Sequence, residues 1–162
     1  MTTMKVKAKK IEGKTNFVTD LSNLLAAGKS KEIIDLSEEY NKLILSAADE
    51  LEKYSGDKKI RHLHLVGELI HNFELKFSER NIELRSLRKN ICEDLKVSQS
   101  RLDYFTRFYT VFDRTSLNDT LSWGIYRELI DIKNETKRKD ALDKLMSGEL
   151  RTTDDIRDFK RN

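Results

Sequence analysis

Polar residues with the side-chain chemistry needed to contact DNA gather between positions 96 and 107. They are Lys96, Ser98, Gln99, Ser100, Arg101, Tyr104 and Arg107. Glutamine and arginine side chains match the hydrogen-bonding edges of adenine and guanine in the major groove. Serine hydroxyls and the N-terminus of a helix can hold a backbone phosphate. The group therefore predicts a surface that reads double-stranded DNA.

The apolar residues around this group have the spacing of a helix-turn-helix. The required positions are all filled, by Leu87, Ile91 and Leu95 in the first helix, Val97 in the turn, and Leu102 and Phe105 in the second helix. Cys92 is small enough for the second helix to cross the first, and Ser98 is a suitable N-cap. Lys96 stands where such turns often have a glycine with positive φ, at a cost of about 1 kcal/mol.

The same stretch has a second interpretation, as a helix corner whose polar face is simply solvated. The protein would then be a non-enzymatic helical interaction module, its turn purely structural and its partner another protein. Both interpretations are compatible with the residues alone.

Helical periodicity extends over most of the chain, and no stretch alternates like a strand. The sequence has no proline, six glycines and 36% charged residues, which is typical of helices with solvated faces. We expect helices over about 15–28, 30–54, 58–77, 81–95, 98–112, 120–132 and 134–146, and a short last helix capped by Thr152 or Thr153. The predicted fold class is all-α: a multi-helix domain containing a helix-turn-helix, preceded by a basic arm and a long helical pair.

The chain divides into three predicted segments that differ in charge. Residues 1–14 form a flexible basic arm, with five lysines against one glutamate. Residues 15–79 form a helical bundle with 8 basic and 12 acidic groups, suited to dimerisation or docking. Residues 80–162 hold the helix-turn-helix and its linker helices, and 80–114 carry 8 basic against 5 acidic groups. Although the formal net charge is only +3, positive charge gathers where phosphates would be contacted.

Several classes of function are disfavoured by the sequence. The single cysteine, Cys92, excludes an internal disulfide and a multi-cysteine zinc site. There is no P-loop, no nucleophile elbow and no pair of carboxylates placed by strands. His64, Glu68 and His71 share one helical face, but a polar stripe explains them better than a metal site. No apolar run could span a membrane, and no signal-peptide core follows the first lysines. We expect a cytoplasmic protein that is not an enzyme and has no cofactor or metal.

The segment "LSWGIYRELIDIKNETKR" at 121–138 resembles the N-terminal helical domain of YhcG-type proteins. Its Leu-Ser-Trp-x-x-Tyr-Arg-Glu-Leu pattern is filled by Leu121, Ser122, Trp123, Tyr126, Arg127, Glu128 and Leu129. "RFYTVF" at 107–112 and "VGELIHNFE" at 66–74 are similar to further helices of that family, so the likeness covers roughly 60–160. A weaker likeness connects the chain to the helix-turn-helix region of ParB-type plasmid partition proteins.

The chain departs from the YhcG-type pattern in three places. Ile125 stands where the family usually has histidine, and "SGELRTTDD" replaces a turn that contains tryptophan. The PD-(D/E)XK nuclease domain that follows in the family has no counterpart before Asn162. "IEGK" and "FELKF" contain Glu-x-Lys, but in an arm and a helix respectively. The resemblance therefore implies the DNA-binding half without catalysis.

These observations predict a DNA-binding regulator or partition-type adaptor of a plasmid, phage or other mobile element. One recognition helix contacts only a few base pairs, so specific reading normally needs two copies about 34 Å apart. The helical pair 15–54 is not needed to build the turn. We therefore expect a homodimer formed through that pair.

Overall fold

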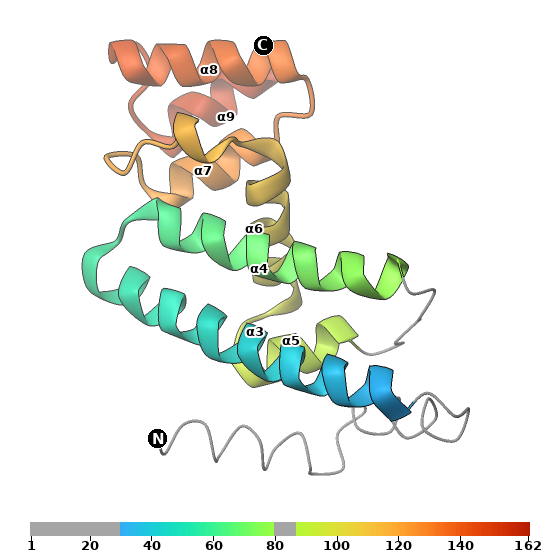
Figure 1. Ribbon diagram of the computed structural model, residues 1–162. Coiled ribbons are helices and arrows are strands. Elements are labelled where there is room, and N and C mark those ends of the chain that lie inside the picture. The colour runs from blue at the N-terminus through green and yellow to red at the C-terminus, as the bar shows by residue number, and fades with distance from the viewer. Residues whose placement is uncertain (1–29, 80–86) are drawn as a thin grey trace.

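The computed structural model describes residues 30–79 and 87–162, where every regular element is a helix (Figure 1). The elements are α3 (Ser30–Asp57), α4 (Ile60–Glu79), α5 (Leu87–Leu95), α6 (Gln99–Val111), the 3₁₀ helix η1 (Arg114–Ser116), α7 (Trp123–Ile130), α8 (Glu135–Ser147) and α9 (Thr153–Arg161). The all-α prediction is thereby confirmed. The predicted arm 1–14 and helix 15–28 lie outside the described residues. Within the described ranges, no helix is both long and apolar enough to cross a bilayer.

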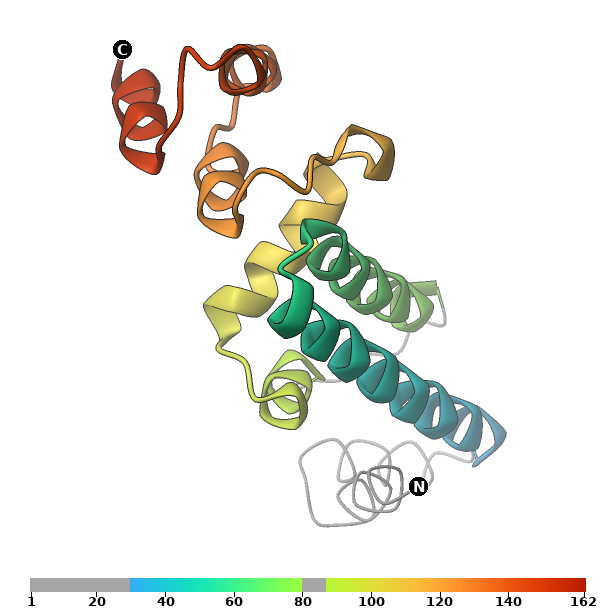
Figure 2. The same cartoon turned by 90° about the vertical axis from the view of Figure 1, so that its left-hand side faces the viewer.

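α3 and α4 form a helical hairpin, seen side by side in Figures 1 and 2. The turn between them passes through Lys58, which has a left-handed φ of 59° and donates its N–H to the carbonyl of Tyr54 at 2.9 Å. Buried apolar side chains recur at three- and four-residue steps, as predicted for amphipathic helices. They are Leu36, Tyr40, Leu43, Ile44 and Ala47 of α3, and Ile60, Leu63, Val66, Ile70, Phe73 and Phe77 of α4.

α6 crosses α4 at Gly67, where the two helices approach each other through their backbones. A Cβ atom placed on Gly67 would lie 1.9 Å from the carbonyl oxygen of Phe105 and 2.7 Å from its carbonyl carbon. Only glycine fits such a contact. Beside the crossing, the His64 ring of α4 packs edge-on against Phe108 and Tyr109 of α6, at 5.4 and 5.3 Å between ring centroids.

α5 is attached to the hairpin by polar contacts as well as by apolar burial. The hydroxyl of Tyr40 donates to Asp94 Oδ2 at 2.6 Å, and burial together with this carboxylate raises the pKa of the phenol. Arg88 of α5 binds Glu74 of α4 through both carboxylate oxygens, at 2.7 and 3.0 Å, and also donates to Asp103 of α6. The described helices of segments 15–79 and 80–162 therefore share one core.

This shared core bears on the predicted role of the pair 15–54. The apolar face of α3 between Leu36 and Ala47 is buried within the chain, against neighbours that include α4 and α5. α3 is therefore part of the structure that supports α5 and α6, rather than a spare helix. Residues 15–29 of the predicted pair lie outside the described residues.

The three C-terminal helices begin at side-chain caps. Ser122 Oγ accepts the N–H of Ile125 at the start of α7, and Asn134 Oδ1 accepts that of Lys137 at the start of α8. Thr152 and Asp155 form a reciprocal capping box at the start of α9, which confirms Thr152 as the cap. Each cap satisfies N–H groups that the first turn of a helix leaves without a partner. Glu128 of α7 then fixes α9 by pairing with two of its cations, Arg157 and Lys160, at 2.9 and 2.6 Å.

The hairpin contains a histidine whose charge should make stability depend on pH. His62 lies between two carboxylates, Nδ1 at 2.6 Å from Glu50 and Nε2 at 3.0 Å from Asp57. Burial alone would lower the pKa of His62, but the hydrogen bonds to Glu50 and Asp57 outweigh it and raise the pKa. Protonated His62 therefore favours the folded state. Its contribution is complete below the unfolded pKa of about 6.5 and is lost as pH rises through the higher folded pKa.

We expect this loss of stability to disappear in His62→Gln, whose amide can still form hydrogen bonds but carries no charge. Urea denaturation at about pH 5.5 and about pH 8.5 measures the difference in unfolding free energy between the two conditions. Other groups that titrate in this range act equally in both proteins, so the comparison isolates His62. An equal pH difference in wild type and variant would contradict the assignment.

Candidate nucleic-acid interface

α5 and α6 are joined by a tight turn with the local geometry expected from the sequence. Lys96 has a φ of 56°, the left-handed conformation predicted for this position. The N–H of Val97 donates to the carbonyl of Cys92 at 3.0 Å, which closes the end of α5. Ser98 is extended, with φ −74° and ψ 156°, and its hydroxyl accepts the N–H of Arg101 at 3.2 Å. Ser98 is thus the N-cap of α6, as predicted.

The apolar residues predicted to hold the two helices together are mostly buried. Leu87, Ile91, Leu95, Leu102 and Phe105 are buried, whereas Val97 is only half-buried. α6 also has a close backbone contact with α4, at Gly67. Cys92 is half-buried beside Gln99, with Sγ 3.8 Å from Oε1, and burial raises the pKa of its thiol.

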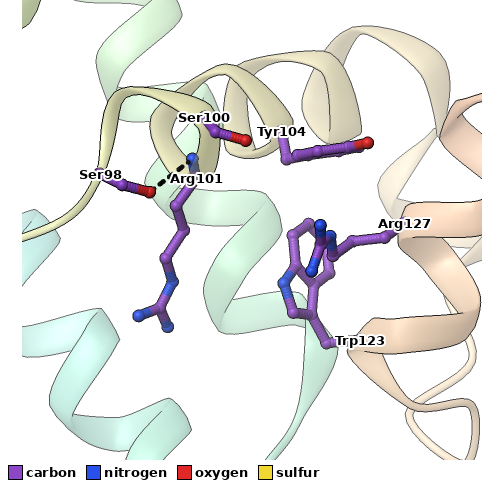
Figure 3. A pocket seen from close by; sticks show the side chains of 6 residues that line it. All are labelled: Ser98, Ser100, Arg101, Tyr104, Trp123 and Arg127. Carbon is purple, nitrogen blue, oxygen red and sulfur yellow. Dashed lines mark hydrogen bonds between the residues drawn. The ribbon is translucent and has the colours of Figure 1, made fainter.

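The polar residues at the start of α6 separate into two groups. The first group faces α5, where the Gln99 amide donates to Asp103 at 3.1 Å and Asp103 also accepts from Arg88. The second group lines a pocket of about 330 Å³ between α6 and α7 (Figure 3). Its lining residues are Ser98, Ser100, Arg101 and Tyr104 of the α6 end, and Trp123 and Arg127 of α7. This surface is called the α6–α7 pocket below.

The α6–α7 pocket is positively charged. Neither Arg101 nor Arg127 makes an ion pair with a carboxylate among the residues described. Arg127 lies over the ring of Tyr104, with its guanidinium carbon 4.8 Å from the centroid, and Arg101 lies over Phe105 at 5.4 Å. Such cation–π contacts hold a guanidinium in place without neutralising its charge. The two cations are therefore positioned and remain available to an anionic ligand.

A third cation, Lys58, lies in the turn between α3 and α4 beside Tyr54. Lys58 Nζ lies 5.5 Å from the ring centroid of Tyr54. Burial raises the pKa of Tyr54, and the nearby charge of Arg101 partly opposes that rise. Lys58 also has no carboxylate partner in the described ranges. Positive charge thus extends from the pocket towards the end of α3.

Tyr104 and Arg107 are held by the C-terminal end of α7. The Tyr104 hydroxyl donates to Asp131 Oδ2 at 2.9 Å. Arg107 pairs with Asp131 Oδ1 at 3.3 Å and donates to the carbonyl of Ile130 at 3.0 Å. Both residues were predicted as DNA contacts, and both are committed to contacts within the chain. Tyr104 still exposes its ring to the pocket, whereas Arg107 is not one of the pocket residues.

Sequence reasoning did not include Trp123 and Arg127 among the site residues. The ring of Trp123 packs on Phe105 and Phe108, at 5.7 and 5.3 Å between ring centroids. Its remaining surface lines the pocket (Figure 3). Arg127 follows Trp123 by four residues, so both lie on one face of α7. That face could have been recognised from its spacing, but its proximity to α6 could not.

His64, Glu68 and His71 do not form a metal site. No group of histidine, cysteine or acidic residues in the described ranges has metal-binding geometry. His64 is 2% exposed and donates from Nε2 to the carbonyl of Phe112 at 2.8 Å. His71 packs against the ring of Tyr109 at 5.4 Å. The two histidines therefore contribute to the contact between α4 and α6.

The α6–α7 pocket combines guanidinium groups, hydroxyls and aromatic rings, which together suit phosphate and nucleobase ligands. Comparison with known proteins adds no relative: no protein-family model, curated protein or solved structure matches this chain.

Proposed function

We propose that α5, the turn at Lys96 and α6 form a helix-turn-helix that binds double-stranded DNA. The observation that carries this proposal is the exposed N-terminal end of α6. There Ser100 and Arg101 are exposed, and Arg127 of α7 adds a second cation without an acidic partner. In this arrangement the first turn of α6 enters the major groove while serines and arginines hold the flanking phosphates.

We expect the predicted DNA-binding residues to have different roles, because their contacts within the chain differ. Arg101 is free to reach a guanine edge or a phosphate, and Ser98 and Ser100 lie beside the same phosphate position. Gln99 would have to exchange its hydrogen bond to Asp103 for one to adenine. The guanidinium of Arg107 lies over the ring of Tyr104. We therefore expect Arg107 to position Tyr104 and not to contact the DNA itself. Lys96, exposed in the turn, contributes charge next to the backbone.

The salt dependence of binding tests this proposal. Each phosphate contact that is lost should reduce the slope of log K against log salt concentration by about 0.9. We expect Arg101→Gln and Arg127→Gln each to lower the slope by about that amount, and the double variant by about twice as much. Mobility shifts on bulk duplex DNA at several salt concentrations measure the slope.

Arg114→Gln is the matched control, because Arg114 is an exposed arginine beyond the opposite end of α6. It should leave the slope unchanged. Equal slopes for the control and both pocket variants would remove these arginines from the interface. Absence of binding at low salt would remove the proposal as a whole.

A regulator or partition-type adaptor remains the role that we propose for such a DNA-binding chain, acting as a homodimer. The buried face of α3 is already used inside the chain, so a dimer needs another surface. The candidate surface is a groove of about 190 Å³ between α3 and α4, where half-buried Leu69 lies among Glu39, Lys42 and Lys76.

The same groove supports the second candidate function, a protein-interaction module. Apolar side chains in a groove with charged rims are typical of protein contacts. A chain that fails to bind DNA at low salt would leave this candidate as the better one.

A further inference from the structure

We propose that the α6–α7 pocket binds a single unstacked nucleotide, with its base against Trp123 and the guanidinium of Arg127 and its phosphate on Arg101. This inference goes beyond duplex binding, since base pairs in a duplex keep their faces covered. It does not depend on the helix-turn-helix proposal. The ligand is defined by its chemistry: one nucleobase joined through a sugar to one phosphate.

The pocket has the size of a small-ligand site. Its volume of about 330 Å³ lies at the lower end of the range for such sites. Its walls come from two helices, α6 and α7, and both are fixed by side-chain caps at the ends that form the pocket. Pre-formed walls reduce the ordering cost of binding.

The aromatic residues are arranged as stacking surfaces for a base. Trp123 is half-buried, with Phe105 and Phe108 packed behind it, so its orientation is fixed from within the core. The ring of Tyr104 is held by its hydrogen bond to Asp131. Arg127 lies over that ring at 4.8 Å, and a guanidinium plane can itself stack on a base. Figure 3 shows the Tyr104, Arg127 and Trp123 side chains together at one end of the pocket.

The other end of the pocket suits a phosphate. The guanidinium of Arg101 points away from the α6 axis on this side, as Figure 3 shows. The Ser100 side chain also lines the pocket and has no role in the cap, which is formed by Ser98. The N-terminal end of a helix as long as α6 adds partial positive charge. The carboxylate of Asp131 already accepts hydrogen bonds from the Tyr104 hydroxyl and from Arg107.

A phosphate site on its own would leave the aromatic lining unexplained. Backbone phosphates of a duplex are contacted by cations, hydroxyls and amides, none of which requires an indole beside them. The Trp123 indole and the Arg127 guanidinium, which lies over the ring of Tyr104, offer planar surfaces on which a base can stack. The pairing of both chemistries within one pocket is what points to a nucleotide.

The only tryptophan of the chain is Trp123, so its fluorescence reports on this pocket alone. We expect deoxyadenosine monophosphate to quench it saturably. Adenosine without phosphate and inorganic phosphate without a base should bind at least about tenfold more weakly, because each lacks one set of contacts. A free tryptophan analogue titrated in parallel corrects for light absorbed by the nucleotide.

Arg127→Gln and Arg101→Gln should each raise the dissociation constant at least about tenfold through loss of a charge-assisted contact. Arg114→Gln should leave it unchanged. Both pocket arginines are exposed, so thermal melts should show that the variants fold normally. Quenching that is absent, or that is unaffected by both substitutions, would overturn the proposal.

The source of the nucleotide is decided by comparing three probes. A single-stranded oligonucleotide that quenches at much lower concentration than the mononucleotide would support an unpaired nucleotide of a strand. Equal affinity would support a free nucleotide as the ligand. A blunt duplex that binds without quenching, together with no response to the other probes, would overturn the nucleotide pocket while leaving duplex binding intact.

Discussion

Gly67→Ala should lower the free energy of unfolding by about 3 kcal/mol, at the upper end of the usual range for overpacking. The added methyl group would lie 1.9 Å from the carbonyl oxygen of Phe105, so α6 must move away from α4. The obstacle is backbone, which cannot turn aside as a flexible side chain does. Alanine's higher helix propensity offsets only about 1 kcal/mol.

Gly56→Ala provides the matched control for this substitution. Gly56 also lies in a helix, α3, but a Cβ atom there meets nothing within 4 Å. We expect no loss of stability and a gain of up to about 1 kcal/mol. Thermal and urea denaturation compare the two variants, and a decrease of about 6–12 °C in melting temperature is expected for Gly67→Ala alone. Melting within about 1 °C of wild type would mean that α6 does not touch α4 at this point.

The helices and much of the core could be predicted because their causes are local. The helix predicted over about 58–77 corresponds to α4, and of its apolar side chains Ile60, Leu63, Val66, Ile70 and Phe73 are buried. Leu69 is half-buried instead. The turn was also predictable, because the left-handed Lys96 and the cap at Ser98 depend only on neighbouring residues.

The tight crossing at Gly67 could not be predicted in the same way. A glycine within a helical pattern usually indicates only a small loss of helix propensity. The requirement for glycine at position 67 comes from the backbone of Phe105, which lies in another helix. No spacing rule connects the two positions, because their contact is set by how two whole helices pack.

The candidate site was predicted only in part, for a related reason. Arg101 and the two serines were identified, since they follow a recognisable turn. Trp123 and Arg127 were missed, because they join the site only when α7 packs beside α6. The hydrogen bonds from Tyr104 and Arg107 to Asp131 could not be predicted from the sequence either. Periodicity shows which face of a helix is outward but not what lies next to that face.

Phe108→Ala should lower the free energy of unfolding by about 3–5 kcal/mol, the usual cost of removing a fully buried aromatic side chain. Phe108 is 0% exposed and lies at the centre of an aromatic cluster that joins α4, α6 and α7. Its ring centroid is 4.9 Å from Tyr126, 5.3 Å from Trp123 and 5.4 Å from His64. The cavity would therefore open on three helices at once.

Phe108→Leu and Met146→Ala separate the cavity from other effects. Leucine keeps most of the apolar volume and should cost clearly less than alanine, and Met146 is 58% exposed, so its truncation should change stability by less than about 0.5 kcal/mol. Urea denaturation followed by circular dichroism gives the unfolding free energies. A Phe108→Ala variant within about 1 kcal/mol of wild type would contradict the central packing role of this ring.

The same variant connects the core to the α6–α7 pocket. Trp123 stacks against Phe108 on its inner side, so the cavity should loosen the indole and shift its fluorescence while Arg101 and Arg127 remain in place. Nucleotide binding should then weaken even under conditions where the protein is fully folded. Arg127→Gln, in contrast, should weaken binding without changing the unfolding free energy by more than about 0.5 kcal/mol. Because one variant acts through the position of Trp123 and the other through charge, the pair distinguishes a pocket held in shape by the core from a cationic surface that needs no such support.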